Sequence, residues 1–334
     1  MRVRGSCCKL GAWALAAACS AVVGCATFYQ GPMPGEPANA TFLQVEGARV
    51  RYVDTGKGPA VTLIHGFASA LDTWNGVIPQ LAKNHRVIAL DLKGFGWTDR
   101  PPGDYSPRAE ASLVWALLDA RGVDKTAIVA HSWGSSVALA AVMLHPERVT
   151  RMALYDAWVY EEQLPTMFAW AREDAIGEIL FSLFYKERPD EKLANAFYDK
   201  SLVTEQFAEE VERAMDRPGT VAAALAAVRG QNYERMEKHY PSIKQPVLLL
   251  WGREDTVTTL EMGERLSHDL PNSRMIVYPL CGHLPMIEAA SASNRDLVQF
   301  LSADLAPPAP SKASRAPAPG PAPTPAPSTE EHAE

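Results

Sequence analysis

Short apolar runs of strand character alternate with helical patterns along most of this chain, and this alternation restricts the fold more than any other feature. Several runs are almost wholly apolar and are bounded by turn residues, as in the buried strands of a parallel sheet. Such an alternation predicts an α/β fold with helices on both faces of the sheet and ligands at the carboxyl ends of the strands. The predicted strands are 41–45, 48–54, 60–64, 86–90, 126–130, 151–155, 247–251 and 274–278, and helical patterns between them include 109–121, 135–145 and 286–301.

The stretch 158–240 breaks the alternation, because its patterns are helical throughout. We expect a helical cap that is inserted after the sixth strand and divides the α/β core into parts at 41–157 and 241–305. The dipeptide Glu46-Gly47 predicts a hairpin turn between the first two strands. The expected sheet therefore has eight strands and is mostly parallel.

The N-terminal segment 1–24 has the organisation of an export signal. Basic residues precede an apolar run at 10–24 that is shorter than the roughly 20 residues of a membrane-spanning helix. The run ends in Val-Val-Gly followed by Cys25, which resembles the lipobox of bacterial lipoproteins. The resemblance implies cleavage before Cys25 and acylation of this residue, which predicts an exported lipoprotein anchored in a bacterial membrane and facing the periplasm or the cell surface. The alternative is an ordinary secretory signal cleaved after Ala26.

Two further segments are expected to lie outside the folded core. Segment 25–40 is rich in glycine and proline, which predicts a flexible tether. Segment 306–334 is rich in proline and alanine and has no apolar periodicity, so we expect a disordered tail.

Charge and cysteine content exclude several classes of protein. The net charge is −7, which argues against a nucleic-acid partner because phosphate backbones bind basic surfaces. Four of the five cysteines lie within the first 25 residues and leave only Cys281, so neither a disulfide framework nor a structural zinc site is expected. No dinucleotide-binding or zinc-protease motif occurs, and we expect neither a cofactor nor a metal. The oligomeric state stays open.

The fifth predicted strand leads into a helix through Ala130-His131-Ser132-Trp133-Gly134. This sequence resembles the nucleophile elbow G-x-S-x-G of α/β-hydrolases, with Ala130 in the place of the first glycine. Small residues flank the serine in such elbows because strand and helix come close together at a sharp turn. A chance S-x-G turn is the alternative, but the flanking strand and helix argue against it. Ser132 is therefore the candidate nucleophile.

A general base and an acid are expected at the ends of later strands. His283 follows the last predicted strand, and an imidazole with a pKa near neutrality suits proton transfer to and from a serine. Asp255 follows the seventh strand in a W-G-x-x-D pattern, and the order Ser132, Asp255, His283 is that of the α/β-hydrolase fold. Glu254 and Asp156 are the alternatives for the acid, and we expect both to be structural.

The resemblance also implies an oxyanion hole. His65-Gly66-Phe67 ends the third strand in a sequence common among α/β-hydrolases. The backbone amides of Phe67 and Trp133 are those expected to face the oxyanion. His65 is expected to fix its loop by hydrogen bonding, and His131 to pack beside the elbow.

These motifs follow one another in the order found in one superfamily. The sequence resembles the capped α/β-hydrolases, a group that includes esterases, perhydrolases, meta-cleavage C–C hydrolases, epoxide hydrolases and haloalkane dehalogenases. The resemblance covers about residues 41–303 and rests on the motifs at 65–67, 72–74, 91–96, 130–134, 145–149, 251–255 and 282–283. It is specific for the fold and much less so for the substrate.

The nucleophile narrows the chemistry within that group. Dehalogenases and epoxide hydrolases attack saturated carbon with an aspartate, whereas Ser132 would form an ether that water cannot hydrolyse. We therefore expect attack on a carbonyl and hydrolysis of small-molecule carboxylic esters through an acyl-enzyme. A C–C hydrolase or perhydrolase with the same triad is the alternative, although C–C hydrolases usually carry a glycine-rich loop where this chain has Phe67-Ala68-Ser69. An inactive, hydrolase-fold binding lipoprotein is the alternative from another class.

The cap contains an apolar block rich in aromatic residues, at 167–184. Most of these side chains are expected to pack against the sheet, since apolar residues at helical spacing usually belong to a core. Some are expected to line a pocket for an apolar acyl group.

Overall fold

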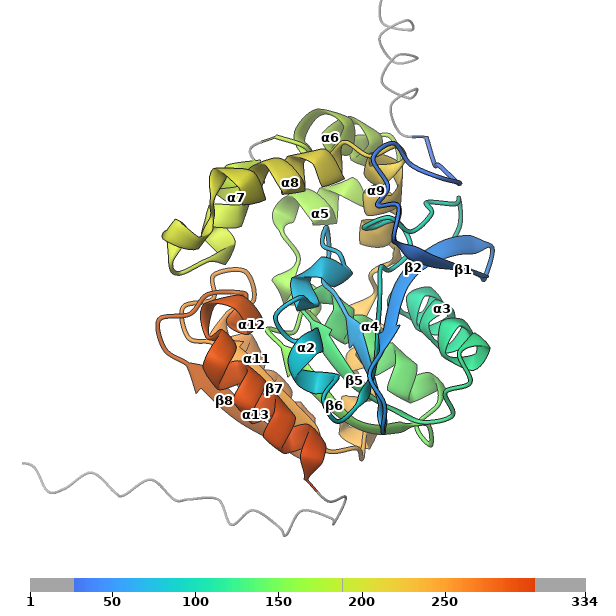
Figure 1. The fold of residues 1–334 in the computed structure, drawn as a ribbon. Helices are drawn as coiled ribbons and strands as arrows, with labels where there is room; N and C mark the ends of the chain where they lie inside the picture. Colours follow the sequence, from blue (N-terminus) through green and yellow to red (C-terminus); the bar gives the residue numbers. More distant parts are fainter. Residues whose placement is uncertain (1–26, 188, 304–334) are drawn as a thin grey trace, which may run out of the picture. The chain divides into compact units, whose positions relative to one another are not determined.

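A computed structural model describes residues 27–187 and 189–303 (Figure 1). Its eight strands form one sheet in the order β1-β2-β4-β3-β5-β6-β7-β8. Pairing is parallel from β4 through β8, and antiparallel for β1 with β2 and for β2 with β4. The mostly parallel, eight-stranded sheet is therefore confirmed. Its strands are β1 (Thr41–Val45), β2 (Ala48–Thr55), β3 (Ala60–Ile64), β4 (Arg86–Leu90), β5 (Thr126–His131), β6 (Val149–Tyr155), β7 (Val247–Gly252) and β8 (Ser273–Tyr278).

The hairpin between β1 and β2 has the two-residue turn that the sequence predicts. Both turn residues have positive φ angles, 48° at Glu46 and 74° at Gly47. Two positive φ angles match the type I′ turn, whose twist suits a tight antiparallel hairpin.

Helices cover both faces of the sheet. On one face α3 (Pro107–Ala120) and α4 (Trp133–Leu144) share an apolar core with α11 (Leu260–Asp269), and the other face packs against η1 (Leu71–Trp74), α2 (Ile78–Leu81) and α13 (Ala290–Ser302). The middle strands β5 and β7 are buried along their whole length, which accounts for their continuous apolar sequences. The helix expected at 286–301 is instead two, because Ala289 leaves helical geometry between α12 (Pro285–Glu288) and α13.

A helical cap lies between β6 and β7, as expected. No strand occurs among its described residues. Within it α9 packs against both α5 and α6. Its elements are η2 (Glu161–Gln163), α5 (Thr166–Ala171), α6 (Ile176–Phe184), α7 (Pro189–Ala196), η3 (Lys200–Leu202), α8 (Glu205–Met215), α9 (Thr220–Gly230), α10 (Tyr233–Glu237) and η4 (Tyr240–Ser242).

The first described residues are bound to the body of the protein rather than forming a free tether. The backbone of Tyr29 exchanges two hydrogen bonds of 2.8 Å with that of Arg100, and the amide of Gly31 donates to the Asp99 carboxylate over 2.9 Å. Met33 is buried, and Glu36 pairs with Arg49. Within the segment predicted to be a flexible tether, these residues are thus hydrogen-bonded to the body, because Asp99 and Arg100 supply partners for this stretch.

The predictions for segments 1–24 and 306–334 and for Cys25 lie outside the described residues. In the part of the chain that the structure describes, no helix is both long and apolar enough to cross a membrane.

Candidate active site

Ser132 lies at a sharp turn between β5 and α4. Its backbone has φ 52° and ψ −126°, a conformation that costs energy in any residue other than glycine and that is typical of the nucleophile elbow. The Ser132 amide donates to the carbonyl of Tyr155 over 2.9 Å, which ties the turn to β6. Gly134 packs so closely that a Cβ there would collide with the His65 carbonyl oxygen. The small residue expected at this position is therefore required by the packing.

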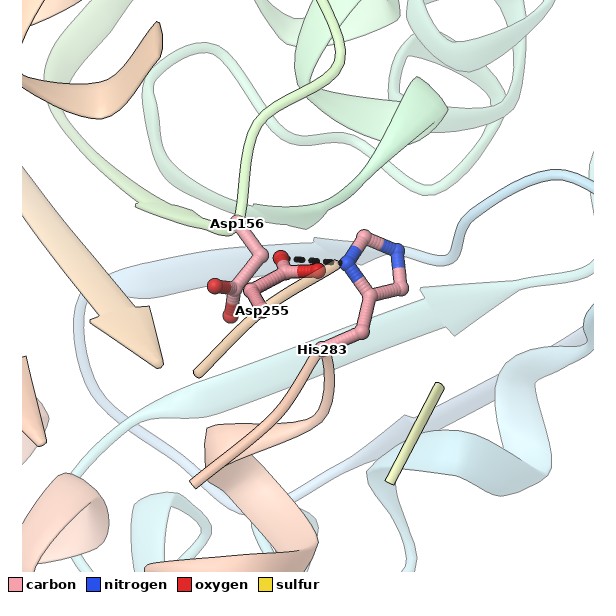
Figure 2. Close-up of side chains that lie close together, drawn as sticks. All are labelled: Asp156, Asp255 and His283. Atoms are coloured by element: carbon pink, nitrogen blue, oxygen red, sulfur yellow. Dashed lines mark hydrogen bonds and ion pairs between the residues drawn. The ribbon is translucent and has the colours of Figure 1, made fainter. Parts of the chain in front are cut away.

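His283 and Asp255 form a buried hydrogen-bonded pair at the carboxyl edge of the sheet (Figure 2). Nδ1 of His283 lies 2.8 Å from Oδ2 of Asp255, and both residues are less than a tenth exposed. Because an ionised carboxylate only accepts hydrogen bonds, Nδ1 carries the proton and Nε2 is left with a free lone pair. The imidazole is thus in the tautomer that a general base requires.

Asp255 is bound by four donors. Oδ1 accepts hydrogen bonds from the amides of Val257 and Thr258, at 2.7 and 3.0 Å. Oδ2 accepts from His283 and from the Thr258 hydroxyl, the latter at 2.7 Å. Burial raises the pKa of Asp255, but the His283 charge and the hydrogen bonds from His283 and Thr258 outweigh it, so the pKa lies below its ordinary value. Asp255 therefore stays ionised beside the imidazole.

Asp156 is a second buried carboxyl group behind this pair (Figure 2). Its Oδ1 accepts from the Gly252 amide over 2.9 Å, whereas its Oδ2 has no partner among the described residues. Burial, and then repulsion by Asp255, raise the pKa of Asp156 well above its ordinary value. Two buried carboxyl groups this close do not both ionise, so Asp156 is the protonated one and Asp255 the charged one.

The other candidate acid, Glu254, has a different contact. Its Oε2 accepts from the amide of Cys281 over 3.0 Å and so supports the loop that carries His283. The geometry therefore places Asp255, and neither Asp156 nor Glu254, in hydrogen-bonding contact with the imidazole.

Asp156, Asp255 and His283 also form a group whose potential metal-ligand atoms lie within 4.8 Å of one another. Both oxygens of Asp255 already accept two hydrogen bonds each, and Nδ1 of His283 is the donor of one of them. Such a donor set suits the orientation of an imidazole and leaves Asp255 with no oxygen free to bind a cation.

Two further histidines support the site without entering the pair. Nε2 of His65 accepts from the amide of Leu92 over 2.9 Å and its Nδ1 donates to the Gly66 carbonyl over 2.7 Å, so His65 fixes its loop as predicted. The ring of His131 lies 4.7 Å from that of His283, and its Nε2 donates to the His283 carbonyl over 2.8 Å. Burial, and then the His283 charge, lower the pKa of His131 to about 3, which keeps this ring neutral.

The two amides expected to form an oxyanion hole come from the residue after Ser132 and from a loop that packs against the elbow. Trp133 follows Ser132 as the first residue of α4, where an amide has no partner within its own helix. The loop of Phe67 lies against the elbow, since a Cβ on the neighbouring Gly66 would stand 3.0 Å from Cβ of Ser132. Among the described residues, neither amide donates to a protein acceptor. Both are thus free to bind a developing negative charge.

The catalytic candidates are enclosed. Ser132 is 4% exposed and His283 is 7% exposed. The cap reaches this loop directly, because the His283 amide donates to the carbonyl of Ala196 over 2.7 Å. Within the described residues the Ser132 hydroxyl makes no hydrogen bond. The hydrogen bond between a nucleophile and its base commonly tightens only when substrate binds.

Two residues at the site escape sequence reasoning. Thr258 binds Asp255 by both its amide and its hydroxyl, and its only signal is its place three residues after the acid. Glu288 joins the His283 loop to the cap: Oε1 accepts from the Gly282 amide, and Oε2 from the amides of Tyr198 and Asp199, at 2.8 to 3.0 Å. No pattern in the sequence links positions 90 residues apart.

Aromatic rings surround the loop of Phe67. Its ring lies 5.3 Å from those of Phe95 and Phe168, 6.2 Å from Trp133 and 6.4 Å from Tyr185. Phe168 and Tyr185 come from the cap, so one member of the apolar block, Phe168, does contact Phe67 in the loop beside the elbow. The expectation that most of this block packs inward is wrong for five large side chains that are 44 to 62% exposed: Trp170, Ile176, Ile179, Leu183 and Phe184.

Comparisons with known proteins agree with this geometry. The α/β hydrolase fold family model matches residues 59–290. A 2-hydroxy-6-oxo-2,4-heptadienoate hydrolase of Pseudomonas putida is 30% identical over 271 residues, which cover 77% of this chain and 94% of that protein. A 2-hydroxymuconate semialdehyde hydrolase of Pseudomonas sp. strain CF600 is 29% identical, over 73% of this chain and 87% of that one.

A solved structure gives the same assignment. The meta-cleavage product hydrolase of Pseudomonas fluorescens IP01 superposes with a TM-score of 0.67 at 29% identity, covering 78% of this chain and 97% of its own. Sequence, fold and site thus lead to one conclusion: the chain is a hydrolase of the α/β-hydrolase fold family.

Proposed function

We propose that this protein is a serine hydrolase that cleaves carboxylic esters of apolar acyl substrates, with Ser132 as nucleophile, His283 as base and Asp255 as acid. The observation that carries the proposal is the hydrogen bond of 2.8 Å between Asp255 and Nδ1 of His283, at the edge of the sheet where Ser132 also lies. It leaves Nε2 of His283 as the free base on the imidazole.

The proposed reaction has two steps. In the first, His283 takes the hydroxyl proton of Ser132 as the oxygen attacks the ester carbonyl, and the negative charge that develops is bound by the amides of Phe67 and Trp133. The alcohol leaves with the proton from His283. In the second, His283 activates a water molecule, which attacks the acyl group bound to Ser132. This step releases the carboxylic acid product and restores the Ser132 hydroxyl. Asp255 stays ionised and stabilises the imidazolium in both steps.

The preference for apolar acyl groups is supported by the rings next to the elbow. Phe67, Phe168 and Tyr185 present aromatic side chains beside the proposed oxyanion hole. Such a wall favours a hydrocarbon chain or ring over an ionised group, because a charge placed there would lose its hydration.

C–C bond hydrolysis is the second candidate, and the relatives favour it. Their names describe hydrolases of 2-hydroxy-6-oxo-2,4-heptadienoate and 2-hydroxymuconate semialdehyde. The same three residues would serve that reaction. Against it, the loop Phe67-Ala68-Ser69 lacks the glycine-rich sequence expected of C–C hydrolases. Perhydrolase activity and an inactive binding role are less well supported, since each triad position holds a competent residue.

A substrate panel separates these functions. Purified protein would be assayed with p-nitrophenyl esters of graded acyl length, with a 2-hydroxy-6-oxo-dienoate, and with acetate plus hydrogen peroxide, in each case beside Ser132→Ala. We expect the highest kcat/KM on an ester and no reaction with Ser132→Ala. A kcat/KM for the dienoate above that of every ester would assign C–C hydrolysis instead, and inactivity on all three would support the binding role.

We also propose that the protein is exported and held at a bacterial membrane by acylated Cys25. Support comes from the charged start, the short apolar run and the lipobox-like sequence before Cys25. Several acyl chains would hold the protein firmly, since each buried methylene contributes about 0.8 kcal/mol.

A further inference from the structure

The outer side of the cap carries an exposed apolar face. It consists of Trp170 on α5 together with Ile176, Ile179, Leu183 and Phe184 on α6, and these side chains are 44 to 62% exposed. Spacings of three and four residues place Ile176, Ile179 and Leu183 along one side of the helix. Single exposed apolar residues are common on soluble proteins, but five large ones on two helices that pack together are typical of an interaction surface.

Packing on the opposite side of α6 fixes the direction of this face. Phe181 is fully buried, and its ring stacks on Tyr185 at 5.2 Å and lies 5.8 Å from Phe168. Gly177 is pressed against the Ala171 carbonyl and the side chain of Leu225 on α9. The helix cannot turn its outer residues inward without exposing Phe181. The apolar face is therefore a permanent feature of the folded cap.

The face lies near the point where the described chain begins. Lys186, just after α6, pairs with Asp216 over 2.7 Å, and three residues further on Gly219 packs against Tyr29. In Figure 1 the first described residues run past α9 on the side of the cap that carries α6. Tyr29 is held by its backbone hydrogen bonds to Arg100, and it is only the fourth residue after Cys25 in the chain.

We propose that the face formed by Trp170, Ile176, Ile179, Leu183 and Phe184 inserts into the surface of the lipid bilayer that carries Cys25. An acyl anchor so few residues before Tyr29 would keep the body within about 15 Å of the bilayer, since an extended chain spans at most about 3.6 Å per residue. Contact of the face with lipid then becomes an intramolecular event at high effective concentration. Interfacial helices bury Trp, Phe and Leu side chains in the bilayer surface, and this face presents Trp170 from α5 together with Leu183 and Phe184 from α6.

Charges beside the face indicate the kind of lipid. Glu173 and Asp174 flank its N-terminal end and are exposed, with Asp174 reaching toward Arg229 at 3.6 Å. Lys186 flanks the other end and is engaged by Asp216. With no free cluster of cations on these flanks in the described structure, the contact depends on apolar insertion and not on anionic head groups. A zwitterionic bilayer is therefore a sufficient partner.

Depth measurement with a single fluorescent probe tests the proposal. Full-length protein would be expressed with its leader, purified in detergent and reconstituted into phosphatidylcholine vesicles. After removal of residues 1–24 the chain retains Cys25, whose sulfur the diacylglyceryl group occupies in the acylated protein, and the fully buried Cys281. The Ile179→Cys variant of the acylated protein therefore offers one accessible thiol for an environment-sensitive dye. Leu202→Cys is the matched control, because Leu202 is 39% exposed on the cap but lies outside the face.

We expect nitroxide-labelled lipids to quench the dye on Ile179→Cys several-fold more than the dye on Leu202→Cys. Adding Ile176→Gln and Leu183→Gln to Ile179→Cys should return the quenching to the control level, with an unchanged melting temperature as evidence of folding. Equal quenching of the two dyes would overturn the proposal. Shielding of the dye on Ile179→Cys from both water and lipid would also overturn the proposal if the shielding increased with protein concentration. That result would show that a second copy of the protein covers the face.

Mass spectrometry of the same sample reports whether Cys25 is acylated. If the chain proves to be processed elsewhere and unacylated, the protein would be mixed directly with the same vesicles. Co-flotation that is lost in Ile179→Gln/Leu183→Gln but kept in Leu202→Gln/Ile287→Gln would still support insertion of the face. Absence of co-flotation would refute it.

Discussion

Oδ2 of Asp255 accepts hydrogen bonds from both Nδ1 of His283, at 2.8 Å, and the hydroxyl of Thr258, at 2.7 Å. The carboxylate is thus held by side chains from its own loop and from the loop after β8. Its position does not depend on substrate, so the imidazole is oriented before any substrate enters. This preorganisation is what the proposed serine chemistry requires of its acid.

Replacing Ser132 by alanine should abolish ester hydrolysis and leave the fold intact. The hydroxyl makes no hydrogen bond among the described residues. Its removal also leaves the close packing of Gly134 against the His65 carbonyl in place. Loss of a triad nucleophile lowers turnover on the order of a million-fold in comparable enzymes. The measurement is kcat on the best p-nitrophenyl ester, with circular dichroism as the folding control. Labelling of the wild type, but not of Ser132→Ala, by a fluorophosphonate would identify the reactive residue, whereas near-normal turnover in a folded variant would refute the covalent mechanism.

Asp255→Asn and Asp156→Asn form a matched pair that separates the two buried carboxyl groups. An asparagine amide at position 255 donates a hydrogen bond to Nδ1 of His283 only when Nδ1 lacks its proton, so it favours the tautomer whose Nε2 cannot act as base. In serine proteases the corresponding change lowers turnover on the order of ten-thousand-fold. Asparagine at position 156 replaces a neutral acid by a neutral amide that still accepts from the Gly252 amide. We expect this second variant to retain most of its kcat at pH 7. The reverse ranking would place the catalytic acid after β6.

Much of this site is predictable from the sequence, because local signals determine it. Apolar strands followed directly by Ser132, Asp255 and His283 place the three residues at one edge of a parallel sheet. The contacts that sequence reasoning misses join distant segments: Glu288 binds the amides of Tyr198 and Asp199, and Tyr29 pairs with Arg100. Such contacts depend on the folded arrangement and leave no periodic pattern in the chain.

The cap shows a second reason for failure. Apolar spacing at 176–184 predicts a helix, and α6 is present. The same spacing does not say which surface covers the apolar side, and here the side with Ile179 and Leu183 is exposed while Phe181 is buried. Hydrophobic periodicity identifies an amphipathic element but not its partner.

Glu110 should make the protein less stable as the pH rises from about 4.5 to about 7. Burial raises the pKa of this carboxyl group from its ordinary value of 4.5 to about 7, and the Lys93 charge only partly opposes it. In that interval the folded state binds more protons than the unfolded state, so the free energy of unfolding falls with increasing pH. Glu110→Gln removes the titration and should flatten this part of the curve. Urea unfolding of both proteins at pH 4.5, 5.5, 6.5 and 7.5 measures it, and curves of equal slope would contradict the assignment.

Glu288→Ala should loosen the cap over the His283 loop. The substitution removes the acceptor for three backbone amides, those of Gly282, Tyr198 and Asp199. Leaving such donors without a partner costs about 1–3 kcal/mol for each that stays buried. We expect faster limited proteolysis within 189–199 and a lower kcat, because His283 is carried by the loop that is released. Glu212→Ala, on the exposed side of α8 in the same cap, is the control. Equal proteolysis rates in the two variants would show that Glu288 does not hold the cap.

Lipidation of Cys25 is the prediction that bears most on where the enzyme acts. If Cys25 is acylated, the protein should enter the detergent phase on phase separation, and mass spectrometry should find acylated Cys25 as its first residue. Cys25→Ser removes the thiol that takes the lipid, so acylation should be lost while kcat on soluble esters is unchanged, because Cys25 lies outside the described body that contains Ser132. The backbone pairing of Tyr29 with Arg100 adds a constraint, since it leaves few residues between the anchor and the body. An acylated protein should therefore lie close to the bilayer, and wild-type protein found in the aqueous phase with residue 27 at its start would instead establish an ordinary secretory signal.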